Sequence, residues 1–333
     1  MKKSSGIIPL LLVLVIVLTY ITGCKKKDNP IKYPQGIFPD SVYNLTGLNS
    51  QYDDYNSNIF LLGNSMPILF SSNRKSSGGQ FDLVQGSLWY QFDQTTGAFS
   101  VGSEMTTDAF YAAVINKANT TGNDFGPYSI FSSTDGYEYL FLASQNAVDP
   151  LDLYYLKYLP RFGNNIPDIT GPLPVKLLNS SSDDAYISFD LNEDSAYFTS
   201  NRGGNFDIYL HKRPTSTALD NWLNQNFAAS TLVDSVNSAY DDKCPFVYKN
   251  FMLFASNRPG GMGGYDLYYS VFKNGKWNSP VNMGPKINTS SDEYRPFLGY
   301  HPEFKNMFMV FSSNKPGGSG GFDLYFTGMI VTK

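Results

Sequence analysis

The chain contains 333 residues, enough to bury a large hydrophobic core, and it carries a formal net charge of −4. That charge provides no basic surface for nucleic acid, so we expect no nucleic-acid partner. Two histidines and two cysteines leave little material for a His-based metal site or a catalytic triad, so we predict neither a metal nor a cofactor. The 24 tyrosines and 25 phenylalanines, beside only 16% charged residues, favour many packed β-strands.

Residues 1–23 have the features of a secretory signal peptide. Two lysines precede an apolar run, residues 7–18, that is too short to span a bilayer as a helix. The segment ends in Ile-Thr-Gly-Cys, which resembles the bacterial lipobox and implies that Cys24 becomes the lipid-modified first residue of the mature protein. Residues 24–40 are polar and rich in proline, which is typical of a tether. We therefore expect a protein attached to a membrane by its N-terminal lipid, in the bacterial cell envelope at the outer membrane, with the periplasmic or surface face left open.

The remainder of the chain repeats one phrase five times: an apolar strand, a Ser-Asn-Arg-like corner, a loop usually rich in glycine, and a strand built on Asp-Leu-Tyr. A period of this size is typical of a repeat architecture. The repeated aspartates are Asp82, Asp152, Asp207, Asp266 and Asp323. We expect each of them to cap the loop amides of its own repeat.

A second motif precedes each phrase, as in Asn-Ser-Gln-Tyr-Asp-Asp at residues 49–54. These residue types form turns by hydrogen bonding to their own backbone, so the motif marks a loop, called here the acidic loop. Between acidic loops there is room for four antiparallel strands, the size of a propeller blade, and the links are too short for parallel crossovers. The sequence therefore predicts an all-β fold, a single five-bladed β-propeller over residues 41–333, whose N-terminal strand closes the last blade.

Residues 254–268 and 311–325 contain strings of the form F-x-S-N-R…G-G-x-x-D-L-Y, with Lys315 in place of arginine in the second. These strings resemble the TolB-type, WD-like β-propeller repeat family, and the resemblance extends over about residues 41–333. The second copy departs from the pattern, with Ser-Gln-Asn at residues 144–146. Propellers of this kind often present one face to a partner protein, so the resemblance implies a protein-binding lipoprotein.

Strand alternation predicts that the acidic loops and the Ser-Asn-Arg corners share one rim. The charged rim residues either hold neighbouring blades together, which their recurrence favours, or form a ring that binds a cation or a basic peptide. They are Arg74, Arg202, Arg258, Lys315, Asp53, Asp54, Asp183, Asp184, Asp241, Asp242, Asp292 and Glu293.

Two segments exceed the repeat and are candidate binding insertions, because variable loops on a rigid scaffold often carry binding. Residues 85–117 include Trp89, Tyr90 and Phe92, and residues 212–229 include Trp222. Loop decoration without a binding role is the alternative. The other cysteine, Cys244, starts an apolar strand and is predicted to be a buried small hydrophobe.

The leading functional hypothesis is a non-enzymatic envelope lipoprotein whose propeller face binds an unidentified envelope protein. The alternative is a carbohydrate-active hydrolase or a glycan-binding propeller. A hydrolase needs two or three unlike carboxylates around the axis, whereas the prominent acids here repeat. Asp190 and Glu193 do not repeat, but their surroundings favour a turn at the face opposite the acidic loops. The sequence therefore predicts no catalytic residue.

Overall fold

The computed structural model describes residues 29–61, 63, 65–145, 149–163 and 166–329. The predicted signal peptide and Cys24 lie outside the described residues. Within the described ranges, no helix combines the length and the hydropathy that crossing a membrane requires.

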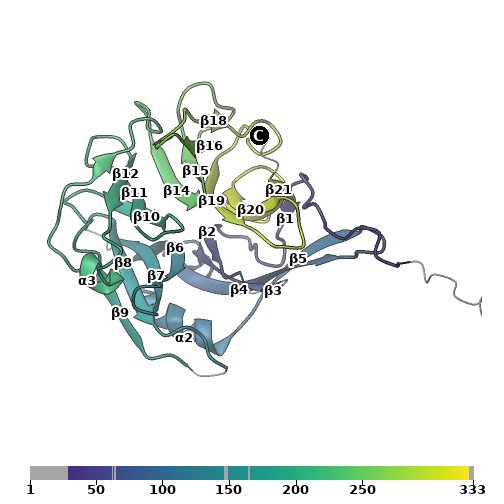
Figure 1. Ribbon diagram of the computed structural model, residues 1–333, viewed down its shortest axis with the longest axis horizontal. Coiled ribbons are helices and arrows are strands. Elements are labelled where there is room, and N and C mark those ends of the chain that lie inside the picture. The colour runs from purple at the N-terminus through teal and green to yellow at the C-terminus, as the bar shows by residue number, and fades with distance from the viewer. Residues whose placement is uncertain (1–28, 62, 64, 146–148, 164–165, 330–333) are drawn as a thin grey trace, which may run out of the picture.

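Five antiparallel sheets are arranged around a central axis, which confirms the predicted propeller (Figure 1). Each blade starts with its innermost strand and proceeds outward in chain order. Blade one contains β2 (Asp54–Ile59), β3 (Ser65–Ser72), β4 (Asp82–Phe92) and β5 (Phe99–Met105). Blade two contains β6 (Asn123–Phe131), β7 (Glu138–Gln145), β8 (Asp152–Tyr158) and β9 (Ile169–Pro174). Blade three contains β10 (Asp184–Phe189), β11 (Ser195–Ser200), β12 (Asp207–Lys212) and β13 (Thr231–Leu232).

Blades four and five depart slightly from this scheme. Blade four contains β14 (Asp242–Tyr248), β15 (Phe251–Ser256) and β16 (Asp266–Lys273), with the short strands β17 (Lys276–Trp277) and β18 (Val281–Asn282) both paired to β16. Blade five contains β19 (Glu293–Gly299), β20 (Met307–Ser313) and β21 (Asp323–Met329). Its outer strand is β1 (Tyr43–Asn44), in which Tyr43 pairs with Phe326 of β21. The N-terminal strand therefore closes the ring as predicted, and the closed seam covers the edge of the last sheet.

Residues 36–40, which the sequence places in the tether, are part of the folded body. Gly36 forms a β-bridge with Phe304, and Phe38 is fully buried. The Phe38 ring stacks on Phe304 at 3.7 Å and meets Tyr90 edge-on at 5.2 Å. Aromatic burial of this extent outweighs the flexibility expected of a proline-bearing segment.

The insertion at residues 85–117 forms regular structure. Strands β4 and β5 make a long hairpin, and the backbone N–H groups of Lys32 and Tyr33 bond to the Gln94 carbonyl at its tip (Figure 1). The helix α2 (Ala109–Ala118) follows, capped by the Asp108 carboxylate, which accepts from the Phe110 N–H at 2.9 Å. The short elements η1 (Arg74–Ser76) and α3 (Leu219–Leu223) complete the secondary structure of the described residues.

Each innermost strand carries a β-bulge two residues after the last acid of its acidic loop. The bulged residues adopt positive φ angles between 45° and 57°, and they are Asn56, Gly126, Tyr186, Cys244 and Arg295. In three blades the bulged N–H donates to a hydroxyl of the preceding blade, as from Cys244 to Thr199 Oγ1 at 3.1 Å. The bulges bring five unlike residues around the axis, although the strands that carry them repeat.

The burial of Phe38 predicts that replacing it with alanine costs about 3–5 kcal/mol in free energy of unfolding. The adjacent Ile37 is 56% exposed, so Ile37→Ala should change the free energy by no more than about 0.5 kcal/mol. Urea unfolding of both variants measures the difference. Equal stabilities of the two variants would show that the N-terminal segment does not belong to the folded body.

Candidate functional site

The rim arginines form ion pairs with the last acid of the acidic loops. Arg202 lies 2.5 Å from Asp184, and the equivalent pairs Arg74–Asp54 and Arg258–Asp242 have the same separation. Each aspartate is fully buried, and its other oxygen accepts from the backbone N–H of the loop serine four residues earlier. The arginine also donates to a loop carbonyl, as from Arg202 to Leu178 at 2.8 Å. Charge and hydrogen bonding are thus satisfied within each corner.

The other acid of each loop contacts the preceding blade. Asp53 accepts from the Phe322 N–H at 2.8 Å, and the same bond joins Asp183 to Leu151, Asp241 to Phe206, and Asp292 to Tyr265. The loop asparagine holds the same strand from the other side: Asn49 accepts from the Leu324 N–H at 2.8 Å and donates to its carbonyl at 3.0 Å. The rim residues therefore join each blade to its neighbour.

Blades two and five lack the arginine. In blade two, burial raises the pKa of Asp124 to about 6, although the Thr120 N–H donates to its carboxylate at 2.7 Å. In blade five, the Ser313 hydroxyl donates to Glu293 at 2.9 Å. The Lys315 ammonium lies over the Tyr325 ring at 3.9 Å.

The repeated aspartates of the Asp-Leu-Tyr strands contact their own loops most clearly in blades four and five. Asp266 accepts from the Met262 N–H at 2.7 Å, and Asp323 accepts from the Ser319 N–H at 2.5 Å. Asp207 accepts from Asn205, whereas Asp82 lies 3.5 Å from the Lys75 ammonium. Burial, followed by the charge of nearby Asp184, raises the pKa of Asp152 to about 6. Among the described residues, no group of three or more His, Cys, Asp or Glu side chains is arranged to hold a metal ion.

The structure does not leave the insertion aromatics exposed for a ligand. Tyr90 and Trp222 are each only 1% exposed, and Trp89 and Phe92 are half-buried. Tyr90 packs against the N-terminal segment, and Trp222 meets Phe189 edge-on at 6.2 Å. Tyr90 and Trp222 are therefore part of the packed interior, because the insertions fold back onto the propeller.

A pocket of about 410 Å³ lies on the axis, at the face opposite the acidic loops. Its walls are the ends of the five innermost strands together with the start of β7 and the turn after β10, so every blade contributes. Tyr128, Phe189 and Phe246 lie deep in this axial pocket, whereas Phe131 and Leu191 are exposed at its mouth. An apolar and aromatic concavity with a few polar groups is the usual form of a small-molecule site.

Three carboxyl groups line the axial pocket: Glu138, Asp190 and Glu193. Burial raises the pKa of Glu138. Burial, then the charge of nearby Asp194, raises the pKa of Asp190, while the Asp194 N–H donates to it at 3.1 Å. Glu193 is paired with the buried Arg213 at 3.2 Å and accepts from the Ser133 N–H, so its position is structural. Carboxyls with raised pKa values in a concave site are candidates for acid–base chemistry.

Asp190 and Glu193, which the sequence marks as nonrepeating acids, lie at the face opposite the acidic loops as predicted. Glu138 was not predicted from the sequence. The register of the blades puts Glu138 where the others have Met66, Asp194, Asn250 and Met307, so the position varies from blade to blade and gave no clear signal in the sequence.

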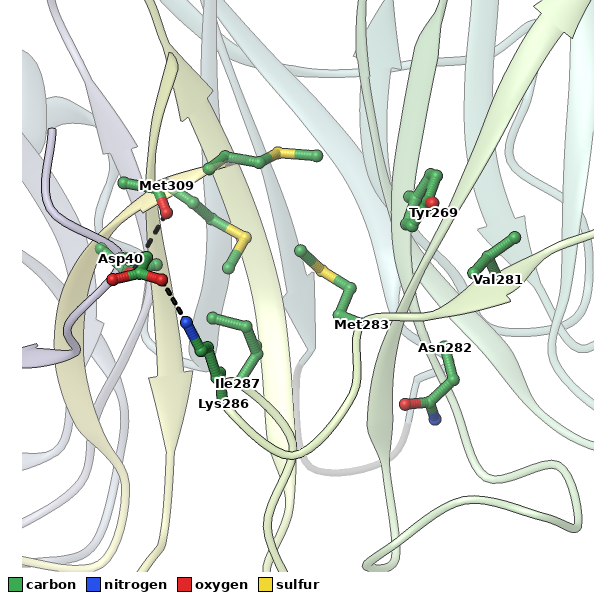
Figure 2. Close-up of a pocket in the computed structure, with 11 residues that line it drawn as sticks. Asp40, Tyr269, Val281, Asn282, Met283, Lys286, Ile287 and Met309 are labelled. Carbon is green, nitrogen blue, oxygen red and sulfur yellow. Dashed lines mark hydrogen bonds and ion pairs between the residues drawn. The ribbon is translucent and has the colours of Figure 1, made fainter. Parts of the chain in front are cut away.

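A second cavity, of about 350 Å³, opens between blades four and five. Figure 2 shows the ion pair of Asp40 with Lys286 beside Met283 and Met309. The cavity lies beside β18, the two-residue strand at the edge of blade four. Its lining is largely apolar, and its two charges are paired with each other, so it offers no free acid or base.

Comparisons with known proteins identify the architecture. No protein-family model matches the chain, and no curated protein matches it. Among solved structures, an endo-arabinase from Bacteroides thetaiotaomicron is 13% identical with a TM-score of 0.52, over 90% of this chain and 98% of its own. A thermostable family-43 glycoside hydrolase is 12% identical with a TM-score of 0.52, over 84% and 90%. An α-L-arabinofuranosidase from Podospora anserina, solved with cellotriose, is 11% identical with a TM-score of 0.52, over 88% and 96%.

At this level of identity, these likenesses show the fold. They also correct two predictions from the sequence. The resemblance to TolB-type, WD-like propellers is wrong, because the similar structures are glycoside hydrolase propellers. The hypothesis of a non-enzymatic scaffold that binds an envelope protein is also wrong as the leading function, because the same comparisons favour its carbohydrate-active alternative.

Asp124, which has no arginine partner, and Asp184, which is paired with Arg202, should respond differently when each is replaced by asparagine. Folded Asp124 has a pKa near 6, above the unfolded value, so the folded state binds more protons between about pH 4 and 6. Wild-type stability should therefore fall as pH rises through that window, and Asp124→Asn should remove this part of the dependence.

Asp184→Asn leaves the Arg202 charge half-buried without its partner, and we expect it to cost about 3–5 kcal/mol. Urea unfolding at pH 4 to 8 compares both variants with the wild type. An Asp124→Asn variant that is as unstable at pH 8 as Asp184→Asn would contradict the assignment of an unpaired acid to blade two.

Proposed function

We propose that the protein is a glycoside hydrolase whose axial pocket holds part of a glycan. The observation that carries the proposal is Glu138, a carboxyl whose pKa is raised by burial, in the wall of a pocket that all five blades build. The fold, which is shared with arabinan-active and family-43 enzymes, supports the same class. Fold alone does not determine activity, so the proposal depends on the pocket residues.

The pocket suits a sugar chemically. The exposed ring of Phe131 at the mouth offers a flat apolar surface for the C–H face of a pyranose or furanose ring, and the nearly buried rings of Tyr128, Phe189 and Phe246 form the apolar floor. Carboxyl and amide groups at the wall, such as Glu138, Asp190 and Asn58, offer hydrogen-bond partners for its hydroxyls. Arg213 lies next to the pocket, but its charge is paired with Glu193. The pocket is therefore acidic, and it favours neutral glycans over uronic acids.

Glu138 and Asp190 have the properties of the two carboxyl groups that glycoside hydrolysis requires. Protonated Glu138 would give its proton to the leaving glycosidic oxygen as the bond to the anomeric carbon breaks. Asp190, which lies on the adjacent blade, would take a proton from the water that attacks that carbon or would attack it directly. The raised pKa of Glu138 suits an acid that must remain protonated above the ordinary glutamate range.

The experiment is hydrolysis of arabinan, xylan and a panel of aryl glycosides by the purified protein. We expect turnover of at least one substrate, with kcat/KM falling as pH rises through the raised pKa of Glu138, because the acid loses its proton. Glu138→Gln should lower kcat/KM by about 10²–10⁴-fold, the usual contribution of a general acid. Glu104→Gln, at an exposed site on β5, is the matched control and should retain full activity.

Two results would contradict the proposal. One is the failure of every substrate to turn over while a glycan array records binding, which would assign the pocket to recognition without catalysis. The other is turnover that survives Glu138→Gln with its pH profile unchanged.

The membrane anchor remains a proposal that rests on the order of residues before Cys24. The described N-terminal segment contacts the tip of the β4–β5 hairpin (Figure 1). Cys24→Ser should move the protein from the membrane fraction of expressing cells to the soluble fraction. Cys244→Ser, which changes the buried cysteine, should leave the fractionation unchanged. Membrane retention of the Cys24→Ser variant would exclude a lipid on this residue.

A further inference from the structure

Arg295 is the bulged residue of β19, and it lies at the centre of the propeller. Its side chain is 1% exposed and reaches across the axis, where Nη2 donates to the Pro127 carbonyl of blade two at 3.2 Å. Its guanidinium lies 5.4 Å from the centre of the Tyr186 ring of blade three. One cation therefore connects three blades in the interior of the ring.

This cation has no counter-charge among the described residues. The other five arginines of the chain each form an ion pair with a carboxylate. Burial lowers the pKa of Arg295, and the groups whose charges act on it are cysteine and tyrosine side chains, which are neutral at pH 7. A guanidinium nevertheless stays protonated in proteins. Carbonyl and aromatic contacts offset only part of the cost of burying that charge.

The same region contains polar atoms without partners. Nη1 of Arg295 and both side-chain atoms of Asn56, which is fully buried on the bulge of β2, form no hydrogen bond. Asn56 and Arg295 are the bulged residues of β2 and β19, innermost strands of adjacent blades that pack against each other. Burial raises the pKa of the Tyr186 hydroxyl, and the Arg295 charge and the polar Asn56 amide both oppose that shift, although no Asn56 side-chain atom makes a hydrogen bond of normal geometry. Buried polar groups in native proteins normally have a protein, water or ion partner.

The unpartnered groups are mainly donors. Nη1 carries two N–H bonds and the Asn56 amide nitrogen carries two more, next to a full positive charge. A metal cation would be repelled here, whereas an anion would satisfy the donors and neutralise the charge together. We infer that the propeller axis binds one small monovalent anion, such as chloride, between Arg295 and Asn56. The site is distinct from the axial pocket, since neither residue lines that pocket.

The direct test is a crystal of the full chain soaked in bromide, with anomalous scattering recorded. We expect one bromide within hydrogen-bonding distance of Arg295 Nη1 and the Asn56 amide. In solution, the thermal midpoint should rise by at least about 2 °C over a hundredfold increase in chloride at constant ionic strength, with gluconate as the balancing ion that is too large to enter. A parallel titration with formate measures whether a small carboxylate raises the thermal midpoint as the halide does.

Asn56→Asp is the decisive variant, because it places a carboxylate of equal size beside the guanidinium. Its midpoint should be insensitive to chloride and should exceed the wild-type value at low chloride. Arg161→Met, which removes a surface arginine, is the control and should keep the wild-type chloride response. The inference is overturned if the density beside Arg295 contains water without a bromide signal. It is also overturned if the wild-type midpoint is the same in chloride and gluconate, or if Asn56→Asp keeps the chloride response.

Discussion

Each blade is joined to the preceding one by the same hydrogen-bonded loop, and the ring depends on that junction. Its asparagine and its first acid, such as Asn49 and Asp53, hold the strand of the neighbouring blade from both sides. The bonds are short, buried or half-buried, and repeated around the axis. The main hydrophobic core contains residues from all five blades, and the angle set at each junction determines whether the last blade meets the first.

The junctions also determine what can reach the axis. At one face, the charged rim groups are occupied by hydrogen bonds and ion pairs within the protein. The residues available for binding or catalysis are therefore those that do not repeat. Those residues lie at two depths: Glu138 and Asp190 in the axial pocket, and Arg295 with Asn56 further inside. The four bulged residues other than Gly126 hold positive φ angles, a strain that is usually retained where the surrounding structure and the function require it.

The comparison with glycoside hydrolase propellers identifies the architecture but does not identify which residues of this chain act in a site. At 11–13% identity the similar structures share the path of the chain and the ring of sheets. The acids of this chain must therefore be judged from their own surroundings. Glu138 has the burial and the raised pKa of an acid, whereas Glu193, its neighbour in the same pocket, is neutralised by Arg213.

The sequence alone determined the strands, the blades, their number and the closure of the ring by residues 43–44, because turn formers and strand alternation are local and repeat with a fixed period. Only the tertiary structure decided which nonrepeating residues meet, because contacts between blades join positions far apart in the chain. Glu138 reached the axial pocket, Arg295 reached the Pro127 carbonyl of blade two, and Tyr90 was buried by the N-terminal segment. A repeat describes what its copies share, and the candidate sites are built from the positions where the copies differ.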